Sequence, residues 1–97
     1  MATYISLMNF TDQGAKTIKD TVARTEAAQK MAKEYGISFK SIHWTLGQYD
    51  VVCEFEAKDE ATMAAFGMAM ASLGNVRAQT LRAFSADETK AIISKMP

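Results

Sequence analysis

His43 is the only histidine of the 97-residue chain, so it is the one imidazole that can act as acid, base or metal ligand near neutral pH. It lies in Phe39–Leu46, a segment rich in strand formers, and a short link joins this segment to a second one, Asp50–Ala57. A tight hairpin turn between them pairs His43 with Glu54 across the strands. The pair predicts a general acid or base oriented by a carboxylate, and the alternative is a satisfied polar pair.

The hairpin has one apolar face and one mixed face, because successive side chains of a strand point to opposite sides. The mixed face carries His43, Thr45 and Glu54, and we expect it to be the open face of the sheet. The apolar face predicts a core covered by helices. Its members are Ile42, Trp44, Leu46, Val51, Cys53 and Phe55.

The first strand, Tyr4–Phe10, is expected to place Ile5 and Leu7 in that core and Tyr4 and Ser6 on the open face, together with Met8 and Phe10. The open face is then too apolar to be left bare and too polar to be a dry core. This mixture is typical of a cavity that binds a small, partly apolar molecule.

Tyr49 and Asp50 follow Gly47 and Gln48 at the tip of the hairpin. A structural interpretation assigns them to turn chemistry, with Asp50 accepting hydrogen bonds from backbone amides. A functional interpretation puts the tip at the mouth of the cavity, where Tyr49 and Asp50 contact the ligand. Both interpretations stay open at this point.

Several function classes do not fit the composition. A single cysteine, Cys53, on the core side permits no thiolate cluster, and one histidine with nearby glutamates is too few ligands for a metal, so we predict no metal site. Equal numbers of acidic and basic residues, with Glu54 and Glu56 on the open face, argue against a nucleic-acid partner. No membrane span or signal peptide is recognisable, which predicts no membrane partner and a cytoplasmic location. The sequence identifies no cofactor.

The remaining segments predict the elements that position these residues. Helical spacing of apolar residues extends from about Ala15 to Tyr35, and a second helix begins after Asp59 and ends near Leu73. Val76–Phe84 is expected to form a fourth strand, and Ser85–Glu88 is a capping box that begins a short final helix. The order βαββαβ predicts one α+β domain over residues 1–97, a ferredoxin-like sandwich with a four-stranded antiparallel sheet and an extra C-terminal helix.

Self-association is a further prediction. The second helix has almost no polar face, 48% of all residues are apolar, and the formal net charge is zero. A chain of this size completes such surfaces by pairing with a second copy. We therefore expect a homodimer or a higher even-numbered oligomer.

The block Ile42–Val52 resembles the signature of the GYD domain family, named after the glycine, tyrosine and aspartate of this turn. The resemblance extends over essentially the whole chain. It implies a small prokaryotic protein of the dimeric α/β-barrel type and implies no particular activity.

Two functions follow as expectations. The first is an oligomeric protein that binds a small, partly apolar molecule in the open-face cavity, with acid or base chemistry at His43. The alternative is a non-enzymatic regulatory or structural homo-oligomer whose open sheet face is a subunit interface. Whether the chain is an enzyme stays undecided between them.

Overall fold

The computed structural model describes all residues from Met1 to Pro97. In chain order the elements are β1 (Ala2–Phe10), α1 (Asp12–Lys16), the 3-10 helix η1 (Ile18–Asp20), α2 (Thr21–Glu34), β2 (Ser38–Trp44), β3 (Val51–Ala57), α3 (Glu60–Ser72), β4 (Val76–Ala83) and α4 (Ala86–Ile93).

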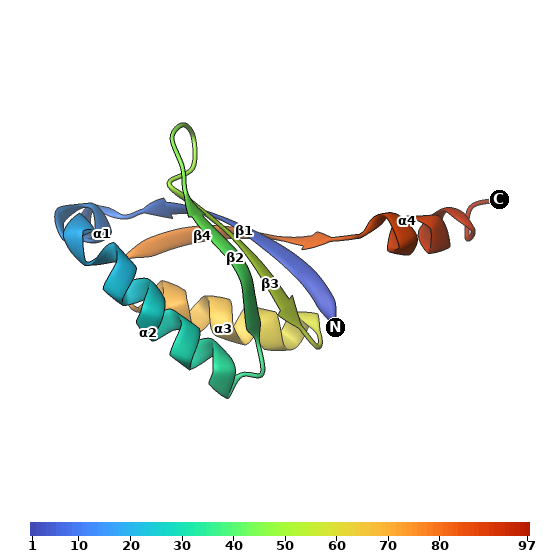
Figure 1. Ribbon diagram of the computed structural model, residues 1–97, viewed down its shortest axis with the longest axis horizontal. Helices are drawn as coiled ribbons and strands as arrows, with labels where there is room; N and C mark the ends of the chain where they lie inside the picture. Colours follow the sequence, from blue (N-terminus) through green and yellow to red (C-terminus); the bar gives the residue numbers. More distant parts are fainter.

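The four strands form one antiparallel sheet in the order β2-β3-β1-β4. Helices α2 and α3 lie on the same side of this sheet, and the opposite side carries no helix (Figure 1). The predicted α+β, ferredoxin-like architecture is therefore confirmed.

The first helical region is interrupted, although its spacing predicted one helix from Ala15 to Tyr35. The side chain of Thr11 caps α1 by accepting from the Gly14 N–H. Further along, the Arg24 guanidinium donates to both the carbonyl and the hydroxyl oxygen of Thr17, at 2.9 and 2.7 Å. Thr17 is thereby kept out of the backbone hydrogen-bond pattern of an α-helix, and α2 begins only at Thr21.

The hairpin register differs from the prediction by two residues. Glu54 lies opposite Ser41, and His43 lies opposite Val52, so the predicted pairing of His43 with Glu54 is wrong. A shift by two keeps each side chain on its expected face. The cause is a longer loop, since β2 ends at Trp44 and β3 begins at Val51.

Tertiary hydrogen bonds hold that loop open. The Asp50 N–H donates to the Met8 carbonyl, and the Asp50 carboxylate accepts from the Phe10 N–H, each at 2.9 Å. Within the loop, Thr45 N–H donates to the Asp50 carbonyl at 2.8 Å. Asp50 therefore continues the pairing between β3 and β1 beyond Val51. It is not available for the tight two-residue turn that the sequence predicted.

Strand β1 faces the opposite way from the prediction. Ile5 lies opposite Glu54 and Leu7 opposite Val52, so Ile5 and Leu7 are on the open face. Tyr4 and Ser6 are instead buried against the helices, with 3% and 2% of their surface exposed. The expectation failed because both faces of this strand are largely apolar, so alternation alone could not distinguish them.

The buried polar groups of β1 have partners. Ser6 and Thr80 share a hydrogen bond between their hydroxyl groups at 2.8 Å, and the Tyr4 hydroxyl donates to a Glu60 carboxylate oxygen at 3.3 Å. These contacts offset the cost of burying hydroxyl groups.

The core centres on the middle strand β3, where Val51, Cys53 and Phe55 are buried as predicted. The rings of Phe39 and Phe66 pack edge-on against that of Phe55. Trp44 and Leu46, which were expected in the same core, are exposed, since Trp44 is the last residue of β2 and Leu46 lies in the loop. The Trp44 indole N–H donates to the Thr21 hydroxyl at 3.0 Å.

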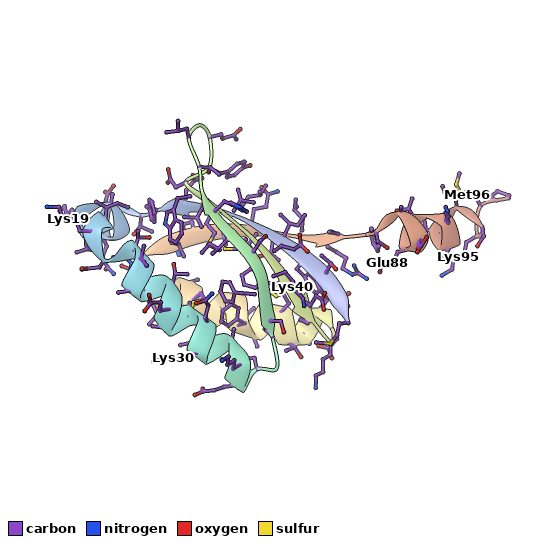
Figure 2. All side chains as sticks on the ribbon, in the orientation of Figure 1. Lys19, Lys30, Lys40, Glu88, Lys95 and Met96 are labelled. Atoms are coloured by element: carbon purple, nitrogen blue, oxygen red, sulfur yellow. The ribbon has the colours of Figure 1, made fainter.

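Helix α4 projects from the end of β4, away from the rest of the chain (Figure 1). Lys95 and Met96 lie at the far end of this arm (Figure 2). The predicted capping box is confirmed, because Ser85 accepts from the Glu88 N–H and Glu88 accepts from the Ser85 N–H. No helix has both the length and the apolar content needed to cross a bilayer.

Candidate functional site

The open face of the sheet has an apolar centre and a polar rim. Ile5 and Leu7 on β1 lie beside Val52 on β3 and Leu81 on β4, and no helix of the chain covers them. Leu81 is 40% exposed. The polar side chains around this centre are Thr3, Asn9, Ser41, His43, Glu54, Glu56, Arg77 and Gln79. An apolar centre within a polar rim is the composition of a protein interface.

His43 and Glu54 are both on this face, but they are diagonal and not directly opposite across the hairpin, and no hydrogen bond or ion pair joins them. His43 is exposed and lies at the outer strand β2. The two ion pairs of the chain join Lys40 to Glu56 and Arg82 to Glu88. An imidazole oriented by the Glu54 carboxylate is therefore not the arrangement found.

The loop of the hairpin forms a polar hollow of about 330 Å³ against β1 and β4. The Tyr49 hydroxyl is 3.5 Å from Gln79 Oε1, a long contact that reaches across the sheet. Thr45 donates its hydroxyl to the Tyr49 carbonyl at 2.6 Å. Thr45 and Asp50 thus bond the backbone, whereas Tyr49 lines the hollow. The other lining residues are Leu7, Asn9, Gln48, Arg77, Ala78 and Gln79.

A larger cavity, of about 490 Å³, lies on the other side of the sheet, between the sheet, α2 and α3. We call it the helix-side cavity. Its floor includes Ser6, Cys53 and Thr80, and its helical walls are rich in small residues. These small residues are Ala27, Ala28, Ala64, Gly67 and Ala71. The cavity is open to solvent on one side, since Met68 and Leu73 in its lining are 73% and 54% exposed.

Four of the six polar side chains that line the helix-side cavity lie where α2 begins and α3 ends. Thr21, Arg24 and Thr25 come from α2, and Asn75 precedes β4. No carboxylate lies within ion-pair distance of Arg24, whose guanidinium donates to oxygens of Thr17 and Gly14. This end of the cavity therefore carries a positive charge that no acidic side chain neutralises.

Titratable groups inside the fold are held in their neutral forms. Burial raises the pKa of Cys53 to about 12, so the thiol stays protonated and is a poor nucleophile. Burial, followed by the nearby Glu60 carboxylate, raises the pKa of Tyr4. No group of three or more His, Cys, Asp or Glu side chains is placed to hold a metal ion.

Of the predicted ligand-binding residues, Ser6 lines the helix-side cavity and Tyr49 lines the polar hollow. The prediction missed Arg24 and the small residues of the helices. Their signal was present in the sequence, because Ala64, Gly67 and Ala71 recur at helical spacing on one face of α3.

A protein family and a curated relative are both similar to this chain. The family model of the GYD domain matches residues 4–93. A curated protein of Thermus thermophilus, the glutamine synthetase and cystathionine beta-lyase binding protein, is 37% identical over 84 residues. The alignment covers 86% of this chain and 88% of that relative.

Proposed function

This chain belongs to the GYD domain family, and from that premise we propose that it is a small binding protein whose partner is a metabolic enzyme. The observation that carries the proposal is the 37% identity to a relative named for binding glutamine synthetase and cystathionine beta-lyase. Because the alignment spans 86% of this chain and 88% of that relative, the similarity covers most of the domain and is not limited to the hairpin motif.

The surface of the chain supports a role in protein binding. Its accessible area is 6539 Å², whereas a compact monomer of this mass exposes about 5500 Å². The difference of roughly 1000 Å² exceeds the ~800 Å² that each partner buries in a standard interface. Surface of this extent is available for other protein chains.

We assign the open sheet face to a second copy of the chain, so that the binding protein is a homodimer. Ile5, Leu7, Val52 and Leu81 form a patch that can pack against itself across a two-fold axis. The enzyme would then contact the surfaces that the dimer leaves free.

Finer roles on the open face stay predictions. Acid or base chemistry at His43 lacks the paired Glu54 that motivated it. A small polar ligand in the hollow beside Tyr49 is supported by the amide and guanidinium groups that line it, with Thr45 and Asp50 holding the loop. A cytoplasmic location is likewise a prediction.

Titration calorimetry tests the main proposal. Glutamine synthetase and cystathionine beta-lyase from the same organism are each titrated with the purified chain, and an unrelated enzyme of similar size is the control. We expect saturable binding to at least one of the two enzymes and none to the control. Absence of binding to both enzymes contradicts the proposal.

A further inference from the structure

The helix-side cavity is created by the sequence of the two helices. Ala28 on α2 and Gly67 on α3 are small residues of its walls. A Cβ atom added at Gly67 would meet no heavy atom within 4 Å, so open space begins directly at the backbone. The cavity therefore results from small side chains at core-facing positions.

Water that enters this cavity finds few partners, because most of the lining is apolar and an ordered water needs several polar groups. The cavity volume of about 490 Å³ lies within the range of about 300–1,000 Å³ that is usual for sites that bind small molecules.

The chemistry of the lining gives the class of that molecule. The apolar walls suit a hydrocarbon body. Arg24 lines one end beside Thr21 and Thr25. Its guanidinium donates to oxygens of Thr17 and Gly14 and has no acidic side chain within ion-pair distance. An anionic head placed there would gain charge-assisted hydrogen bonds. We propose that the helix-side cavity binds a small amphiphile with an apolar chain and a carboxylate head.

This site is separate from the proposed dimer surface, because it lies on the other side of the sheet. The Ser6 and Thr80 hydroxyl groups on the floor of the cavity would face the apolar part of the bound amphiphile. They can accommodate an additional oxygen on the ligand.

Calorimetry on the purified chain alone tests the site with three probes of equal chain length, each below its micelle concentration. The probes are decanoate, decanol and decyltrimethylammonium. We expect decanoate to bind at least tenfold more tightly than the cationic probe, with decanol between them. Equal affinities for the three probes, or no binding of decanoate, overturn the proposal. The enzyme takes no part, so failure here is distinguishable from failure of the proposed function.

A cavity-filling variant locates the binding. Gly67→Leu places a side chain in the cavity, and we expect it to weaken decanoate binding at least tenfold. Ala65→Leu, on the exposed side of the same helix, is the matched control and should change binding less than twofold. Equal binding by wild type and Gly67→Leu overturns the assignment to this cavity. The probe series uses the wild-type chain, so it decides the question even if a variant fails to fold.

Discussion

At the scale of single residues, Gly14 marks the closest approach between the start of α1 and the turn before β4. A Cβ atom on Gly14 would lie 2.1 Å from the backbone oxygen of Asn75. The neighbour is backbone and cannot move aside as a flexible side chain can. This contact, with the hydrogen bond from the Thr11 N–H to Asn75 O, fixes the helical region against the sheet.

We therefore expect Gly14→Ala to lower the free energy of unfolding by about 1–3 kcal/mol. Gly67→Ala is the control, because the same substitution there meets nothing within 4 Å. The control should be neutral or stabilising by up to ~1 kcal/mol, since alanine favours the helix. Urea denaturation measures both, and equal effects at the two positions contradict the close contact.

Cys53 allows a test of burial on the core side of β3. Burial raises its pKa to about 12, from an ordinary value of 9.0. The native thiol should react with a disulfide reagent at pH 8 only after unfolding. Because the folded state retains this proton, its contribution to stability is complete below pH 9 and is lost as the pH rises towards 12. Rapid modification of the native chain would show that the thiol is accessible.

At the scale of elements, the hairpin loop is held by Asp50. We expect Asp50→Ala to cost about 1–3 kcal/mol of unfolding free energy, because the partly buried Phe10 N–H loses its acceptor. Tyr49→Phe should cost less than ~0.5 kcal/mol, since its 3.5 Å contact is long and exposed. Thermal denaturation compares the two variants. A larger cost for Tyr49→Phe would contradict a structural role centred on Asp50.

The stability of helix α4 depends more on its N-terminal cap than on packing against the sheet. Ser85→Ala removes the acceptor of the Glu88 N–H, which costs about 0.5–2 kcal/mol of local helix stability. Hydrogen exchange should speed up over residues 86–93, while the unfolding midpoint of the sheet stays the same. A large drop in that midpoint would show that α4 packs on the body.

The pKa of Glu88 is lowered by the Ser85 backbone N–H and then by Arg82. A carboxyl whose pKa is lowered by folding stabilises the fold above its unfolded pKa and loses that contribution as the pH falls. Acidification should therefore fray α4 before it affects the sheet.

These elements also show which features of the fold can be predicted from the sequence. Caps and breaks such as the Ser85 box are local, so the element order and most boundaries were predictable. The hairpin register depends on the bonds between Asp50 and β1, which are tertiary, and the prediction missed it by two residues. The facing of β1 could not be decided, because Tyr4 and Met8 on one face are as apolar as Ile5 and Leu7 on the other. That error moved Ser6 to the wrong side of the sheet.

At the scale of the whole molecule, the chain is more extended than a compact domain. Its radius of gyration is 14.7 Å, whereas about 12.5 Å is typical for this length. The α4 arm and the uncovered sheet account for this shape (Figure 1). Several exposed apolar residues lie on these two parts. They include Leu81, Phe84, Ile92, Ile93 and Met96.

If the open face joins two copies, a charge at its centre should separate them. We expect Leu81→Glu to weaken self-association at least tenfold by sedimentation equilibrium, because each protomer would bring a carboxylate into the apolar patch. Val22→Glu is the control, since Val22 is an exposed apolar residue of α2 on the helix side of the sheet. Equal association of the two variants would place the dimer interface elsewhere.

The central claim is that this chain acts by binding other protein chains. Native mass spectrometry tests it most directly, first on the chain alone and then after addition of glutamine synthetase or cystathionine beta-lyase from the same organism. We expect an even multiple of the 10.7 kDa chain, and a further species in which that assembly adds to the mass of an enzyme. A spectrum that contains only the 10.7 kDa monomer and the free enzymes would contradict this claim.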